Sequence, residues 1–241
     1  MANPLHALSA IVASLHRPDG TVAVDGFYDG IPALTAERRR EIAAVPFDEA
    51  SYLGALGLAQ AYGEAGYSTL ERLWERPTLE VNGMAGGGKY TVIPHVAVAH
   101  VSCRLVPGQD PDQVIEAIVA HVGAQPAPGV RVTVRADEAR VPAYTIPSGH
   151  PAIRAATAAL ESVYPGQPVL EAVVAGTLPA AALFEEALGA KTLFFSFSTA
   201  DEKLHAPNEF LRIRRLREGM RAWEQLWRLL ADGPHRLASR S

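Results

Sequence analysis

The segment FSFSTADEKLHAPNEF, residues Phe195–Phe210, joins two strongly patterned stretches of this chain. Before it, Lys191–Phe195 is a short apolar run rich in β-forming residues, which predicts a buried strand. After it, Asn208 is a good N-cap for a long helix whose apolar residues recur at helical spacing as far as Leu230. We therefore expect His205 in a loop from a strand to a helix, and in α/β domains such loops line the ligand crevice.

Acidic residues lie on both sides of His205 in this loop, with Asp201 and Glu202 before it and Glu209 after it. A histidine held among carboxylates is a candidate metal ligand. The alternative is an ordinary solvated loop at the start of a helix, because one ligand does not make a metal site. The residues alone leave both interpretations open.

The rest of the C-terminal part alternates between helix and strand patterns. We expect a helix over His150–Tyr164, a strand over Val169–Val174 and a second helix over Leu178–Leu188. Gly176 and Thr177 precede that second helix, where free N–H groups favour an anion, although ordinary capping by Thr177 explains the same pattern. This order predicts half of an α/β domain, whose sheet needs further strands to bury both faces.

The first 140 residues carry four clear signals for the start of a helix, each a residue that favours the N-cap position. They are Asn3, Thr35, Ser68 and Asp110, and proline follows the first and last of them. The predicted helices cover residues 3–16, Ala36–Ala44, Tyr67–Trp74 and a stretch that begins at Asp110-Pro111.

Three strands complete this part, at Thr78–Asn82, Val96–Val106 and Val130–Ala136, with a glycine-rich loop over Gly83–Lys89 after the first. The order is helix, strand, strand, helix, strand. It is the order of a ferredoxin-like βαββαβ unit that lacks its first strand. Residues Val141–Gly149 form a proline-bearing linker at the expected domain boundary.

Val96–Val106 has one wholly apolar face, which we expect to point to the core. Its residues are Ala97, Ala99, Val101, Cys103 and Leu105. Arg104 projects from the opposite face with His100 and Ser102. Its guanidinium either faces solvent or binds a carboxylate through two parallel hydrogen bonds.

Composition excludes several classes of protein. With 22 Lys and Arg against 26 Asp and Glu, the net charge is −4 and no basic stripe appears, so nucleic-acid and membrane binding are not expected. The single cysteine, Cys103, permits no internal disulfide, which predicts a reducing, cytoplasmic location. Because Cys103 lies on the apolar strand face and no G-x-S-x-G motif is present, a cysteine or serine nucleophile is disfavoured.

The motif HAPNE, residues His205–Glu209, resembles the C-terminal metal-ligand motif of the two-zinc aminoacylase and carboxypeptidase family, most closely its carnosinase-like dipeptidases. Other stretches match in the same order, and together the matches span nearly the whole chain. They are NPLHAL from Asn3, VAVDGFYD from Val22, TVIP at Thr91–Pro94, RLVPGQDP from Arg104 and AGTLP at Ala175–Pro179.

The resemblance implies an α/β plus α+β architecture. Residues 1–140 correspond to a ferredoxin-like lid and dimerisation domain without its first strand. Residues 145–232 correspond to the C-terminal half of an α/β zinc-peptidase catalytic domain, and residues 233–241 form a tail. The family's N-terminal metal-binding half, which holds the general base and most ligands, has no counterpart, so the chain is expected to be an inactive fragment with no catalytic residue of its own.

The resemblance also assigns roles to individual residues. His205 matches a metal ligand, Arg104 matches a lid residue that grips the substrate carboxylate, and Thr91, Gly176 and Thr177 match other substrate contacts. The implied reaction is metal-dependent hydrolysis of amide bonds in dipeptides or small peptides, with two zinc ions per site and manganese or cobalt as alternatives. The lid implies a homodimer, in which some lid contacts reach the partner subunit's site.

Two other functions stay open. An N-acyl amino acid deacylase would act on an acylated amino acid, which carries the same free carboxylate. A non-catalytic dimerisation module would need no metal site at all.

Overall fold

The computed structural model describes residues 1–138, 140–147, 149–173, 179–203 and 206–231. The chain divides into two compact units. The first unit contains Met1–Tyr144 and Val173–Ala182, and the second contains Thr145–Ala172 and the chain from Leu183 onward.

The first unit is built on a two-stranded antiparallel sheet of β1 (Thr78–Gly86) and β2 (Ala97–Arg104). The ladder runs from the Thr78–Arg104 pair to the Gly86–Ala97 pair, with a bulge at Asn82. β1 is longer than the predicted Thr78–Asn82, because Gly83–Gly86 continues the ladder beyond the bulge. The predicted glycine-rich loop therefore shrinks to the tip of a hairpin.

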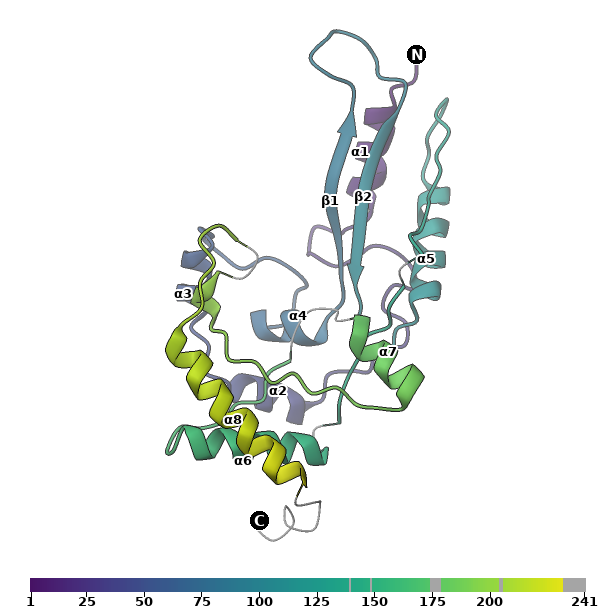
Figure 1. Ribbon diagram of the computed structural model, residues 1–241. Helices are drawn as coiled ribbons and strands as arrows, with labels where there is room; N and C mark the ends of the chain where they lie inside the picture. The colour runs from purple at the N-terminus through teal and green to yellow at the C-terminus, as the bar shows by residue number, and fades with distance from the viewer. Residues whose placement is uncertain (139, 148, 174–178, 204–205, 232–241) are drawn as a thin grey trace. The chain divides into compact units, whose positions relative to one another are not determined.

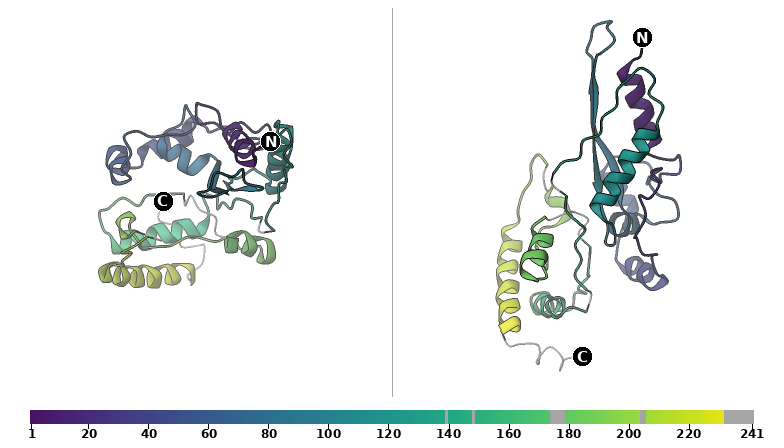
Figure 2. Two further views of the ribbon diagram at one scale, coloured as in Figure 1. Left: turned by 90° about the horizontal axis from the view of Figure 1, so that it is seen from above. Right: turned by 90° about the vertical axis from the view of Figure 1, so that its right-hand side faces the viewer.

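Helices α1 (Pro4–Ser14) and α5 (Pro111–Ala124) cover one face of this hairpin (Figures 1 and 2). Both begin at the predicted caps: the side chain of Asn3 accepts from the N–H of Leu5, and that of Asp110 accepts from the N–H of Asp112. Satisfying a free N–H group in this way fixes where a helix starts.

The core of the first unit lies between the hairpin, α5 and the segment after α1. Buried apolar residues gather there, led by Phe27, which is completely buried, and Leu79 of β1, which is 1% exposed. Cys103 of β2 and Val114 of α5 pack in the same cluster. The expected core face of β2 is confirmed except at Val101, which is 40% exposed.

Three short helices of the first unit precede the hairpin in the chain. They are α2 (Ala36–Ala44), α3 (Glu49–Ala55) and α4 (Thr69–Glu75). Thr35 caps α2 as predicted, and Ser68 caps α4 in a reciprocal capping box with Glu71.

The predicted strand Val130–Ala136 is wrong: this segment forms no strand in the structure. Val132 and Val134, expected to be half-buried, are 40% and 39% exposed. In a βαββαβ unit the last strand pairs with the first. No segment within the described ranges supplies that first strand, so the alternating pattern at residues 130–136 has no neighbour to pair with.

The second unit is centred on α6 (Pro151–Val163) packed along α8 (Ile213–Ala231), as Figure 1 shows. The contact uses small residues, so the two backbones approach closely. On α6 these are Ala155, Ala156 and Ala159, which cluster with Leu226 of α8, and Ala222 of α8 is completely buried one turn before Leu226. The remaining elements are α7 (Pro179–Leu188) and the short 3₁₀ helix η1 (Ala200–Glu202).

Two predicted strands of the second unit are also wrong as far as the structure describes them. Residues 169–173 and Lys191–Phe195 form no strand, and Val174 lies outside the described residues. Leu170 and Phe194 are 48% and 40% exposed. A strand is stabilised by hydrogen bonds to a neighbouring strand, and neither segment has one.

The start of α8 differs from the prediction as well. The helix begins at Ile213 rather than after Asn208. Asn208 instead has a φ of 64°, the left-handed conformation that asparagine tolerates in turns. The chain therefore completes one more turn before the helix begins.

A second apolar stripe runs along α8, away from its contact with α6. Its members are separated by three or four residues and are between 37% and 67% exposed. They are Ile213, Leu216, Met220, Trp223, Trp227 and Leu230. Among the described helices, none combines the length and the apolar character that crossing a membrane requires.

Candidate functional site

Arg104 is the last residue of β2 and pairs with Thr78 at the end of the ladder. Val98, His100, Ser102 and Arg104 alternate with the core-facing residues and are all exposed, as the pattern predicted. The guanidinium of Arg104 makes no hydrogen bond or ion pair with any other described residue. It is therefore free to receive a carboxylate.

Thr91 lies in the tip of the hairpin, in the loop after the Gly86–Ala97 pair, and is exposed. Arg104 lies at the other end of the ladder. Seven residue steps along β2 correspond to about 23 Å at the usual rise of a strand. The structure thus places these two predicted substrate contacts too far apart for one dipeptide to touch both within a single chain.

Three other predicted site residues, Gly176, Thr177 and His205, lie outside the described residues. The predicted tail over residues 233–241 lies outside them too. The acidic neighbours of His205 are described. Asp201 accepts hydrogen bonds from Arg212 and Thr199, and these bonds, led by that from Arg212, lower the pKa of its carboxyl from 3.8 to about 2.

Glu202 is 1% exposed, and its carboxylate accepts from backbone N–H groups rather than facing solvent. Within the described parts of the chain, no three His, Cys, Asp or Glu side chains gather closely enough to hold a metal ion. Asp201 and Glu202 are already occupied by hydrogen-bonding partners. The described residues around the HAPNE motif therefore do not fit a metal ion by themselves.

Cys103 cannot supply a nucleophile at neutral pH. Burial raises the pKa of its thiol to about 11, with a smaller contribution from the nearby Glu80 carboxylate. The reactive thiolate is thus almost absent near pH 7. This outcome agrees with its predicted place on the apolar face of β2.

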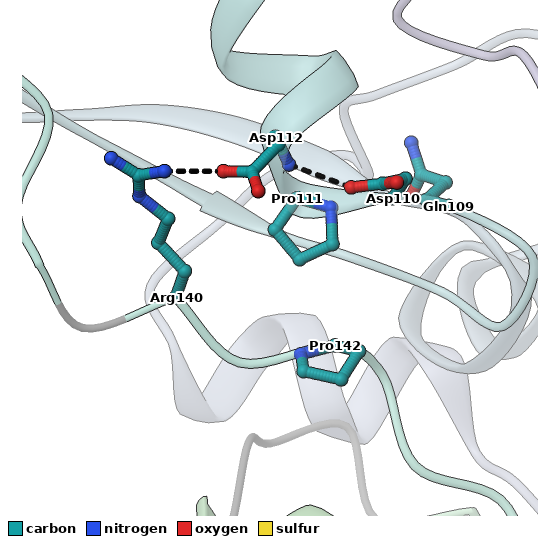
Figure 3. Close-up of a pocket in the computed structure, with 6 residues that line it drawn as sticks. All are labelled: Gln109, Asp110, Pro111, Asp112, Arg140 and Pro142. Carbon is teal, nitrogen blue, oxygen red and sulfur yellow. Dashed lines mark hydrogen bonds and ion pairs between the residues drawn. The ribbon is translucent and has the colours of Figure 1, made fainter.

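Neither of two open pockets that lie among the described residues contains a predicted site residue. One, of about 440 Å³, lies at the start of α5 between Gln109, Pro111 and Pro142 (Figure 3). Of its charged groups, Asp112 and Arg140 are paired with each other, and Asp110 accepts from the N–H of Asp112. The other, of about 250 Å³, belongs to the second unit.

Several polar side chains that line the second pocket already have partners. The Tyr164 hydroxyl donates to Glu218 at 2.9 Å and accepts from Arg215 at 3.1 Å. Ser196 and Ser198 bond to each other at 3.1 Å. Sequence reasoning did not connect Tyr164 with Arg215 and Glu218, because they lie 51 and 54 residues from it in the chain and no local pattern links them.

Comparisons with known proteins agree with this mixed α/β fold. The family described as "Peptidase dimerisation domain" matches residues 1–130, and the chain belongs to this family. Its relatives are M20 metallopeptidases: metallodipeptidases and a metallo-carboxypeptidase. The predicted resemblance to this metallohydrolase family and the predicted fold class are confirmed.

Two of the relatives match by sequence over about half of this chain. Human Beta-Ala-His dipeptidase is 28% identical over 123 residues, which is 49% of this chain and 24% of the relative. The Cys-Gly metallodipeptidase dug1 of Schizosaccharomyces pombe is 27% identical over 123 residues, 49% of this chain and 26% of the relative. These sequence matches cover about a quarter of the length of the relatives.

Solved structures match along nearly the whole chain. The M20 family metallo-carboxypeptidase Sso-CP2 of Sulfolobus solfataricus has a TM-score of 0.82 and 28% identity, covering 95% of this chain and 53% of that one. Human carnosine dipeptidase 1 has a TM-score of 0.77 and 22% identity, covering 95% and 50%. The latter likeness shows the fold alone.

Proposed function

We propose that this chain provides the lid and dimerisation region, residues 1–140, and one ligand-bearing loop of a metal-dependent hydrolase. The proposed reaction is hydrolysis of amide bonds in dipeptides or small peptides. Membership of the peptidase dimerisation family and the names of the relatives support it. The proposed cofactor is zinc, two ions per site, with His205 as one ligand and the other ligands from outside these 241 residues.

Arg104 carries the proposal. Its guanidinium is exposed at the end of β2, and it has no partner among the residues that the structure describes. An arginine offers a planar fork that binds a carboxylate through two hydrogen bonds. A dipeptide presents one free carboxylate, so Arg104 is suited to orient its C-terminal end.

The separation of Thr91 from Arg104 along the hairpin supports the proposed homodimer. Because one small substrate cannot reach both residues of a single chain, we propose that Thr91 serves the partner subunit's site. Two copies joined through their lids would then supply different contacts to each substrate. Cytoplasmic location remains part of this proposal.

The two other functions make different demands on the chain. An N-acyl amino acid also ends in a carboxylate, so Arg104 does not separate a deacylase from a dipeptidase; the names of the relatives favour peptides. A non-catalytic dimerisation module is favoured by one observation. Within the described ranges, no three side chains of metal-ligand type come together.

The test follows the side-chain N–H signal of Arg104 by NMR while a peptide is added. The signal is identified by its loss in Arg104→Lys. We expect Ala-Ala to shift it and the C-terminal amide of Ala-Ala to leave it unchanged, because only the first carries the carboxylate. Arg131, which is exposed in the same unit, is the matched control, and its signal should not respond. Equal shifts with both peptides would contradict the role.

The dimer is tested on the same protein by light scattering after size exclusion. We expect a mass of two chains over the micromolar range. A strictly monomeric chain would contradict the dimer but would leave carboxylate binding to be decided by the NMR experiment.

A further inference from the structure

The buried carboxylate of Glu202 connects the two ends of the HAPNE loop, which we define as residues 199–212. One oxygen, Oε2, accepts from the N–H of Thr199 at 3.1 Å. The other, Oε1, accepts from the N–H of Arg212 at 3.4 Å. Because Thr199 and Arg212 are 13 residues apart, a single side chain closes the loop at its base.

The backbone of Glu202 makes the same connection a second time. Its N–H donates to the carbonyl of Thr199 at 3.0 Å, and its carbonyl accepts from the N–H of Phe210 at 3.2 Å. Lys203, shortly before the motif, and Asn208, within it, have φ values of 57° and 64°, so the chain turns sharply at both residues. Glu202 thus bonds to both limbs of the loop through four hydrogen bonds.

Arg212 completes the arrangement from the outer side. Its Nη1 donates to the hydroxyl of Thr199 and to Asp201, each at 3.0 Å, and lies 3.5 Å from Oε1 of Glu202. Its guanidinium also lies over the ring of Phe210, 4.8 Å from the centroid. A buried carboxylate is costly unless it is paired and hydrogen-bonded, and here both conditions are met.

We propose that Glu202 and Arg212 form a clamp that positions the HAPNE loop, and that Asp201 and Glu202 close this loop instead of binding a metal ion. The inference rests on the proposed function in one respect: the loop carries His205, the ligand assigned there. A metal ligand needs lone pairs directed at the ion. Both oxygens of Glu202 are directed at backbone N–H groups, and Asp201 is held by Arg212 and Thr199.

The first test replaces the carboxylate with an amide of the same size, Glu202→Gln. The new NH₂ group would face an N–H donor, so one of the two side-chain bonds at the base of the loop is lost. We expect amide hydrogen exchange to become about tenfold faster at Thr199 or at Arg212, whichever N–H faces the new NH₂ group, the effect of losing one hydrogen bond to a charged group. Exchange within α6 should not change, which shows that the unit stays folded.

Two further variants make this test specific. Glu186→Gln alters an exposed carboxylate of α7 and should leave exchange in the loop as it is. Arg212→Gln removes the guanidinium but retains the backbone N–H that bonds to Glu202. Hydrogen exchange of the loop can therefore still be measured in this variant if Glu202→Gln fails to fold. In the double variant, the effects of the two substitutions should be non-additive, because the two side chains contact each other.

Zinc distinguishes a clamp from a set of metal ligands. For a clamp, exchange at Thr199 and Arg212 is the same in EDTA and with one equivalent of zinc chloride, and Glu202→Gln exchanges fast in both. For ligands, zinc would slow exchange in the unaltered chain, and the chain in EDTA would resemble Glu202→Gln.

The proposal is overturned by slow loop exchange in both Glu202→Gln and Arg212→Gln, or by zinc-dependent exchange in the unaltered chain. Neither result affects the response of Arg104 to a carboxylate. Failure of the clamp and failure of the proposed function are therefore seen in separate experiments.

Discussion

Arg76 holds the carboxylate of Glu64 through two parallel hydrogen bonds, from Nε to Oε2 and from Nη2 to Oε1, each 2.7 Å long. The side chains are only 13% and 15% exposed. The guanidinium also lies over the rings of Tyr28 and Tyr67, with centroids at 4.9 and 4.6 Å. This pair joins the region before α4 to the core of the first unit.

Replacing Arg76 with lysine should destabilise the first unit. Lysine carries a point charge, so it can neither form the two parallel hydrogen bonds to Glu64 nor stack flat on the rings. We therefore expect the free energy of unfolding to fall by about 1–3 kcal/mol. Arg40→Lys on the exposed side of α2 is the control and should change stability by less than about 0.5 kcal/mol. Urea unfolding followed by circular dichroism measures both, and equal midpoints would refute the role of the pair.

Gly108 and Gly30 approach each other so closely that neither accepts a side chain. A Cβ on Gly108 would lie 2.2 Å from the carbonyl oxygen of Gly30, and the φ of Gly108 is 99°. We expect Gly108→Ala to cost more than about 2 kcal/mol. Gly123→Ala in α5, where a Cβ meets no atom within 4 Å, should instead stabilise by about 0.5–1 kcal/mol. Thermal unfolding measures both variants: the midpoint temperature should fall for Gly108→Ala and rise for Gly123→Ala, and shifts in the same direction would contradict this prediction.

Asp201 should titrate far below an ordinary aspartate. Its pKa is lowered from 3.8 to about 2, chiefly by the hydrogen bond from Arg212. A lowered carboxyl pKa stabilises the folded state above pH 3.8, and that contribution is lost as the pH falls from about 4 to about 2. Carbon NMR of the Asp201 carboxyl checks the midpoint, and Arg212→Gln should move it back toward 3.8. A midpoint near 3.8 in the unaltered chain would show that the bond is absent in solution.

The chain by itself should neither hydrolyse dipeptides nor bind zinc tightly. A zinc site needs at least three protein ligands, and no such group exists among the residues that the structure describes. Calorimetry with zinc and a dipeptide panel assayed with zinc or manganese provide the measurement. Sub-micromolar affinity that disappears in His205→Ala, together with turnover, would show that this chain assembles a metal site.

Local capping signals were the most dependable part of the sequence. Asn3, Thr35, Ser68 and Asp110 each cap a helix in the structure. A cap is decided by a few neighbouring residues, so short-range chemistry found these four, although it wrongly placed the start of α8 after Asn208. The exposed position of Arg104 was predictable for a similar reason, because strand alternation alone assigns the face.

Strand pairing was not predictable in the same way. Val130–Ala136, Val169–Val174 and Lys191–Phe195 have strand composition, yet no strand is described in any of them. A strand exists only where another offers its hydrogen-bonding edge, and the pattern of one segment does not reveal that partner. The contact between Glu202 and Arg212 was not predicted for the same reason, because it depends on how the end of the loop folds back to its start.

The stripe on α8 has a practical consequence for optical work on this protein. Of its three tryptophans, Trp74 lies in α4 of the first unit, whereas Trp223 and Trp227 lie together on α8, with ring centroids 5.8 Å apart. Trp227 is 63% exposed, so a soluble quencher such as acrylamide reaches it readily. Intrinsic fluorescence of a Trp74→Phe variant would therefore report on the second unit alone, and a blue shift with reduced quenching would signal the moment when any partner covers α8.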